Sequence, residues 1–80
     1  MVQLETEVKG IIREVLFVNE EEVVSEAELV ADLGADSLEI FELALQLEKE
    51  YEIEILDEEM ECLLMVGDVI DCIRKRISGR

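Results

Sequence analysis

The sequence contains no histidine, no proline and no tryptophan, and it has only seven basic residues against 22 acidic ones. Without histidine it lacks the side chain that most often acts as a general base, and two cysteines alone cannot complete a tetrahedral zinc site. Two phenylalanines and one tyrosine are too few for platforms that stack nucleic-acid bases. The net charge of −15 repels nucleic acids and anionic membrane surfaces. We therefore expect no metal site, no nucleic-acid partner and no enzyme activity of the chain's own.

The length and the composition predict one small helical domain over residues 1–80. Half of the residues are hydrophobic and only four are glycine, which is typical of a folded helical chain. Eighty residues leave no room for a second domain or for a deep enclosed active site. No apolar stretch approaches the ~20 residues that cross a bilayer, so we expect no membrane insertion.

The cysteines and the first residues of the sequence bear on the compartment. Cys62 and Cys72 are interpreted as reduced thiols that fill the core, rather than as a disulfide pair. Glu5 and Glu7 put acidic charge near the start, where secretory leaders are basic and transit peptides avoid acids. We expect a cytoplasmic monomer.

Hydrophobic periodicity separates the first helix from the irregular segments. Apolar residues recur every three or four positions from about residue 3 to residue 16, which predicts an amphipathic helix. Residues 17–35 lose this period and predict a long ordered loop, with one helical turn around residues 27–29. Residues 52–56 alternate like a strand but have no partner strand, so they are interpreted as an extended connector.

Three further helices follow the long loop. Asp36 can cap a helix over residues 36–51, and Glu39 three positions later suits a capping box. Acidic residues at the start predict a short third helix over residues 57–62, and an apolar repeat predicts a final helix over residues 66–77. The predicted fold class is an all-α four-helix bundle, with three longer helices, one short third helix and a long loop between helices 1 and 2.

The second helix carries two apolar stripes instead of one. At about 3.6 residues per turn, the first stripe is an ordinary core face. It consists of Ile40, Leu43, Ala44, Leu47 and Tyr51. The second stripe consists of Leu38, Phe41 and Leu45, with acidic neighbours at Glu39, Glu42 and Glu48. An apolar strip with an acidic rim favours docking to a partner with a basic patch, although the stripe could also pack beneath the loop over 17–35.

Ser37 occupies the first turn of this helix. Unpaired backbone N–H groups and a partial positive charge at a helix start favour a phosphate ester on such a serine. The plainer alternative is that Ser37 reflects only the preference of serine for helix starts.

The residues around Ser37 resemble the acyl carrier proteins. The run Leu33-Gly34-Ala35-Asp36-Ser37-Leu38 is similar to the L-G-x-D-S-L motif of that family. The resemblance continues through the first helix, residues 21–23, residues 48–55 and the start of the third helix at 57–59. It covers nearly the whole chain without an insertion.

The resemblance implies a non-catalytic carrier. Ser37 would hold 4′-phosphopantetheine from coenzyme A, and Asp36 would help a phosphopantetheinyl transferase to recognise the site. Acyl groups would be attached to this arm as thioesters. The arm would present them to enzymes of fatty-acid biosynthesis, or of related polyketide or specialised lipid biosynthesis. Acyl-transferring and chain-elongating enzymes with basic patches would dock on Leu38, Glu39, Phe41, Glu42, Leu45 and Glu48. The candidates for an acyl pocket between helices are Ile55, Met60, Leu63 and Ile70, for which a plain core role is equally open.

Five residues depart from the family's pattern. Phe17 stands where many relatives have Gly, Leu56 where many have Pro, and Leu64-Met65 where Thr commonly opens the last helix. Met60 replaces a small residue and could narrow the acyl pocket or adapt to its contents. These departures leave open whether the carrier serves general fatty-acid synthesis or a specialised pathway.

A different class of function is an unmodified acidic helical adaptor, which would bind a basic partner protein through the second helix. The cluster Glu20-Glu21-Glu22 lacks the spacing of a calcium loop, so we expect no more than weak cation binding there.

Overall fold

The computed structural model describes residues 2–79. The helices are α1 (Val2–Leu16), α2 (Ser37–Tyr51), α3 (Asp57–Glu61) and α4 (Val66–Ser78), with one turn of 3-10 helix, η1 (Glu20–Glu22), in the first loop. No β-strand occurs within the described residues. The predicted four-helix bundle, with three longer helices and a short third one, is confirmed.

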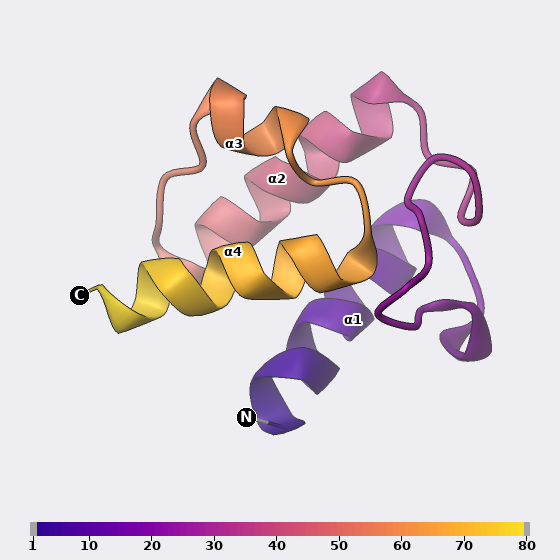
Figure 1. Cartoon of the computed structure of the whole chain (residues 1–80), viewed down its shortest axis with the longest axis horizontal. Helices are drawn as coiled ribbons and strands as arrows, with labels where there is room; N and C mark the ends of the chain where they lie inside the picture. Colours follow the sequence, from indigo (N-terminus) through magenta and orange to yellow (C-terminus); the bar gives the residue numbers. More distant parts are fainter. Residues whose placement is uncertain (1, 80) are drawn as a thin grey trace.

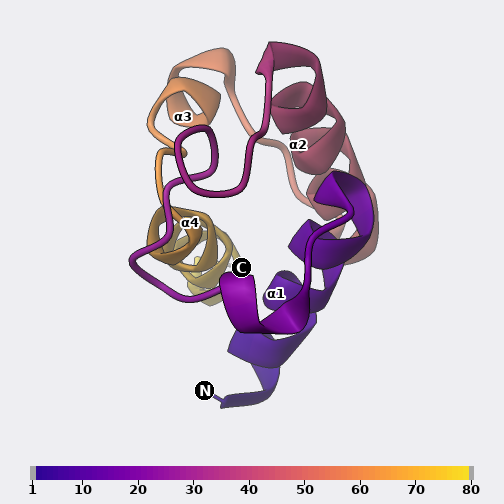
Figure 2. The same cartoon turned by 90° about the vertical axis from the view of Figure 1, so that its right-hand side faces the viewer.

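The four helices surround one aliphatic core. Figure 1 shows α2 and α4 running toward the end of the molecule where the C-terminus lies, and α3 lying above α4. After a quarter turn, α3 and α4 lie on one side and α1 and α2 on the other, with the 17–35 segment in front of them (Figure 2). No helix of residues 2–79 combines the length and the apolar character that crossing a membrane requires.

The core is formed by the apolar stripes of α1, α2 and α4 together with apolar residues of the connecting segments, mainly the first loop. Its fully buried side chains include Val8, Ile12, Leu29, Leu43, Leu47, Val66, Val69 and Ile73. No polar or charged residue is buried among the described residues, so the charge lies on the surface. Burying a leucine or isoleucine contributes about 1.5–3 kcal/mol, so these side chains supply most of the driving force for folding.

The end of α1 shows the effect of one departure from the family's pattern. Phe17 follows α1 directly, adopts φ = 57° and leaves its ring 90% exposed. Its N–H donates to the Arg13 carbonyl at 2.9 Å, as a helix-ending residue does. The left-handed conformation suits glycine and costs other residues roughly 1–2 kcal/mol. The phenylalanine is therefore strained and contributes no packing.

The long first loop pairs with the segment before α4. Leu29 N–H donates to the Leu64 carbonyl at 2.9 Å, and Val66 N–H donates to the Ala27 carbonyl at 3.0 Å. The prediction of a helical turn around residues 27–29 is wrong in position, because Glu28 forms an antiparallel bridge with Met65 and the turn begins at Leu29, with the Asp32 N–H donating to the Glu28 carbonyl at 2.9 Å. The 3-10 turn lies at η1 instead, and other turns close after Glu28.

Two smaller expectations have mixed outcomes. Residues 53–56 connect α2 and α3 without helix or strand, and Leu56 is extended, as predicted, whereas Glu52 ends α2 in the left-handed conformation with φ = 53°. Both cysteines are free thiols, but only Cys72 packs against the core, where burial raises the pKa of its thiol. Cys62 is exposed at the end of α3, so its prediction as a core residue is wrong.

Candidate functional site

Ser37 is the first residue of α2, and its side chain is exposed. The helix begins there because the Asp36 carboxylate accepts the Glu39 N–H at 2.8 Å, while the Glu39 carboxylate accepts the Asp36 N–H at 3.2 Å. This is the predicted capping box, and it fixes the first turn from both sides. The Ser37 hydroxyl therefore projects from a rigid and accessible helix start.

The first turn of α2 can receive an anion. The capping box occupies the N–H groups of Asp36 and Glu39, and neither the Ser37 nor the Leu38 N–H has an acceptor within residues 2–79. Free N–H groups at a helix start, together with the helix dipole, stabilise a phosphate. The start of α2 would therefore stabilise a phosphodiester on Ser37, although the protein as a whole repels anions.

An open groove of about 660 Å³ lies beside Ser37, between α2 and α3. Its volume falls within the range of about 300–1,000 Å³ that is usual for small-molecule sites. Ile40 of α2 and Met60 of α3 both line it. The loops complete it with Glu28, Val30, Leu63, Leu64 and Met65. The serine and an apolar groove thus lie side by side.

The four candidates for an acyl pocket divide into two pairs. Met60 and Leu63 line the groove, the first half-buried and the second buried. Ile55 and Ile70 are 5% and 3% exposed and belong to the hydrophobic core, and they do not line the groove. Of the four candidates, only Met60 and Leu63 therefore lie in the groove beside Ser37.

The second stripe of α2 is exposed. Leu38, Phe41 and Leu45 are 66%, 46% and 48% exposed, so the stripe does not pack beneath the first loop. The core stripe is buried as predicted at Leu43, Ala44 and Leu47, with Ile40 and Tyr51 half-buried. One helix thus presents apolar side chains both to the core and to solvent.

The acidic residues beside this stripe differ in what they do. Glu42 is exposed, whereas Glu39 is half-buried and occupied in the capping box. Glu48 is also half-buried, and its carboxylate accepts the Ile55 N–H at 2.7 Å. Glu48 therefore anchors the connector after α2, a contact that the sequence pattern gave no reason to expect.

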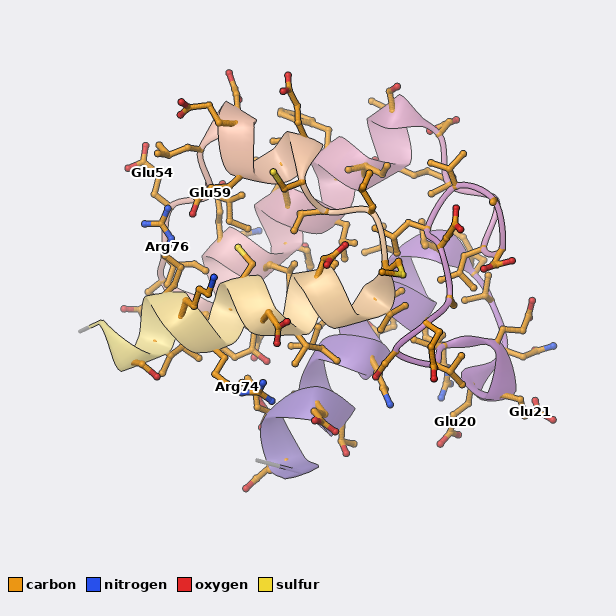
Figure 3. The ribbon with its side chains drawn as sticks, in the orientation of Figure 1. Glu20, Glu21, Glu54, Glu59, Arg74 and Arg76 are labelled. Atoms are coloured by element: carbon orange, nitrogen blue, oxygen red, sulfur yellow. The ribbon has the colours of Figure 1, made fainter. Side chains whose placement is uncertain are left out.

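The polar contacts of α3 are made through Glu59. The Glu59 carboxylate accepts the Leu56 N–H at 3.0 Å, and it pairs with the Arg76 guanidinium of α4. Figure 3 shows Arg76 reaching up from α4 toward Glu59. These contacts, with the Leu56 bond as the largest cause, lower the pKa of the Glu59 carboxyl. A proline at position 56 would remove the N–H that Glu59 accepts.

The start of α4 replaces a missing cap. Met65 has no side-chain acceptor, but the Asp68 carboxylate accepts the Leu64 and Met65 N–H groups at 3.2 and 2.9 Å. Leu64 and Met65 are left at the groove, where they are 65% and 39% exposed. Neither residue is among the site residues predicted from the sequence. A signal for them is present in the sequence. Two apolar residues stand just before the last helix, where a hydroxyl residue would be the usual cap.

Comparison with known proteins agrees with this geometry. The family described as "Phosphopantetheine attachment site" matches residues 6–73. A solved structure described as an acyl carrier protein (Rv0033) of Mycobacterium tuberculosis superposes with a TM-score of 0.79 at 29% sequence identity. The match covers 94% of this chain and 95% of that one. The likeness therefore extends over nearly the whole chain.

Proposed function

The chain belongs to the acyl carrier protein family, whose members bear covalent 4′-phosphopantetheine, and on that premise we propose that Ser37 is its attachment residue. The observation that carries this proposal is the placement of Ser37. It is an exposed hydroxyl on a capped helix start, beside an apolar groove. We also propose that the 80 residues act as a single carrier domain.

The residues around Ser37 position it and do not activate it. Asp36 and Glu39 are engaged with each other's backbone, so neither is placed as a base for the hydroxyl. The attaching enzyme must therefore supply the base, and Asp36 at the helix start helps that transferase to recognise the site. The group itself supplies a terminal thiol that forms a thioester with an acyl chain.

Partner enzymes dock on the exposed stripe of α2. Leu38, Phe41 and Leu45 give an apolar strip, and Glu42 adds an exposed carboxylate beside it. Enzymes that offer a basic rim around an apolar hollow fit this surface. We propose that these are a phosphopantetheinyl transferase and the acyl-transferring and chain-elongating enzymes of fatty-acid or related biosynthesis. The protein acts as a cytoplasmic monomer with no catalysis of its own.

Intact mass tests the attachment residue. The purified apo protein is incubated with coenzyme A and a phosphopantetheinyl transferase of broad specificity. We expect the mass to rise by one phosphopantetheine in the wild type and not at all in Ser37→Ala. The matched control is Ser25→Ala, since Ser25 is also exposed and lies outside α2. An unchanged wild-type mass, or a gain that survives Ser37→Ala, would contradict the proposal.

The exposed stripe also favours a second candidate, an unmodified acidic adaptor. An adaptor binds its basic partner equally well with Ser37→Ala and loses binding with Glu42→Lys. A carrier loses its acyl group with Ser37→Ala and loses docking with Glu42→Lys. The mass measurement separates the two, because only a carrier gains mass.

A further inference from the structure

The two cysteines line the same pocket. Cys62 follows α3 and is exposed, whereas Cys72 lies on α4 and is half-buried. The open pocket that they share has a volume of about 310 Å³ and is also lined by Glu58, Glu59, Leu63 and Lys75. Both cysteines are free thiols. The fold therefore brings together two thiols that stand ten positions apart in the sequence.

The register of α3 and α4 explains why the cysteines meet. The two helices run in opposite directions, and α3 lies above α4 in both views (Figure 1, Figure 2). Glu59 of α3 pairs with Arg76 of α4 (Figure 3). Cys62 comes three positions after Glu59 and keeps a right-handed helical conformation, while Cys72 comes four positions before Arg76. Residues three or four apart share a helix face, so one turn away from this ion pair the two cysteines face each other.

The two thiols differ in reactivity. Burial, the largest cause, raises the pKa of the Cys72 thiol, and the Glu59 carboxylate raises it further against the opposing charges of Arg76 and Lys75. Cys72 is therefore protonated at neutral pH and shielded by its surroundings. Cys62 is exposed, and oxidants react first with the accessible thiol. An oxidant thus attacks Cys62 first, and Cys72 is the thiol placed to react next.

We propose that Cys62 and Cys72 form a modification site, at which a hydroperoxide oxidises the two thiols to a disulfide bond that joins α3 covalently to α4. A disulfide needs Cα atoms within about 7 Å of each other. α3 buries none of its five residues, so it can approach α4 without opening the core. The thiol form is the resting state, since disulfides that form in the cytoplasm are transient. This inference goes beyond the carrier function and does not depend on Ser37.

The oxidation proceeds in two balanced steps. The Cys62 sulfur attacks one peroxide oxygen and becomes a sulfenic acid, while the O–O bond breaks and the other oxygen leaves as water or an alcohol. The Cys72 sulfur then attacks the Cys62 sulfur, so that the S–S bond forms and the S–O bond breaks. The departing hydroxide takes the proton of the Cys72 thiol and becomes water. The two thiols lose two protons and two electrons in total, and the peroxide is reduced by them.

Intact mass and thiol counting test the site in the full-length apo protein. The reduced protein is treated with a small excess of hydrogen peroxide, and the remaining thiols are alkylated with N-ethylmaleimide. We expect a monomer that is lighter by two hydrogen atoms, about 2 Da, and carries no maleimide. Reduction with dithiothreitol should restore two alkylated thiols. Ser37→Ala should give the same result, because it leaves both cysteines in place.

Three outcomes of this measurement would overturn the proposal. They are covalent dimers, a sulfinic acid on Cys62 beside a free Cys72, and two free thiols after prolonged treatment with peroxide. A loss of two hydrogens in the wild type but not in Ser37→Ala would also overturn it, because the reaction would then depend on the carrier residue. Failure of the proposed carrier function leaves the expected result unchanged, so the two can fail separately.

Two single variants test the order of attack. Dimedone, which reacts with sulfenic acids, should label the Cys72→Ser variant, because oxidised Cys62 then has no thiol to react with. The Cys62→Ser variant should lose this label, since its remaining thiol is half-buried and protonated. Equal labelling of the two variants, or label in Cys62→Ser alone, would overturn the assigned order. The wild-type mass decides whether the disulfide forms even if Cys72→Ser does not fold.

Hydrogen exchange tests what the disulfide does to α3. A helix with few buried contacts opens locally, and a covalent bond to α4 restricts that opening. We expect the α3 amides to exchange about tenfold more slowly in the oxidised protein than in the reduced protein. The amides of η1 lie outside the segment that the disulfide closes, so they should keep their rate. Unchanged exchange in α3, or equal slowing in η1, would overturn the joining of α3 to α4.

Discussion

The two walls of the groove are held in place by different forces. α2 buries Leu43, Ala44 and Leu47 in the core along its length. α3 has five residues and buries none of them. Its connections are the half-buried Met60, the Leu56 N–H bond to Glu59, and the pairing of Glu59 with α4.

This difference teaches that the groove has one fixed wall and one wall that can move. Buried aliphatic contacts are lost only when the core opens, whereas exposed polar contacts exchange with water at little expense in free energy. Local opening draws on regions with few buried contacts, and α3 is such a region. For the carrier proposed above, this division would keep Ser37 fixed on α2 while α3 adjusts beside it.

The largest expected effect comes from breaking the fixed wall. Leu47 is fully buried, so Leu47→Ala removes apolar contacts and leaves a cavity. We expect the free energy of unfolding to fall by about 2–5 kcal/mol, measured by urea denaturation. Leu45→Ala is the matched control on the same helix, since Leu45 is 48% exposed, and its effect should stay within about 0.5 kcal/mol. Similar losses in both variants would contradict the distinction between the two faces of α2.

A smaller effect is expected from the movable wall. Met60→Ala removes the side chain through which α3 packs against the core. Because Met60 is only half-buried, we expect a loss of about 1 kcal/mol in unfolding free energy. Hydrogen exchange of the α3 amides should quicken while α2 amides change little. Leu64→Ala is the control, because Leu64 lines the same groove but is 65% exposed. Equal quickening in α2 and α3 would mean that the two walls open together.

The parts of this arrangement that local chemistry decides could be predicted from the sequence. The start of α2 follows from Asp36 and Glu39, which form their capping box within one turn. The two stripes of α2 follow from the helical period, and the exposure of Leu38 and Phe41 agrees with it. The short third helix follows from its acidic start at Asp57.

The parts that depend on distant segments could not be predicted. The Leu29 N–H bonds to the carbonyl of Leu64, 35 positions later, and no local pattern reports that pairing. Periodicity shows that Ile70 faces inward but not whether that side is core or groove. Glu48 looks like a surface acid until the chain turns and brings the Ile55 N–H to it.

The smallest effect is expected from the contact between Glu59 of α3 and Arg76 of α4. Glu59→Gln keeps the size of the side chain and removes its charge, which weakens the bonds to Leu56 and Arg76. The pair is partly exposed, so we expect a loss of about 0.5–1 kcal/mol in unfolding free energy at neutral pH. Hydrogen exchange should quicken in α3 and leave α4 unchanged. Glu58→Gln is the control, since Glu58 neighbours it, is exposed and takes part in no ion pair of residues 2–79.

The stability that Glu59 contributes depends on pH with a definite sign. The pKa of Glu59 is lowered in the folded state from its ordinary value of 4.5. The unfolded chain therefore binds a proton first as the pH falls, so the contribution of Glu59 is complete above pH 4.5 and is lost below it. We expect the stability difference between the wild type and Glu59→Gln to vanish in acid. A difference that persists unchanged through this range would show that packing, and not the charge of Glu59, holds the movable wall in place.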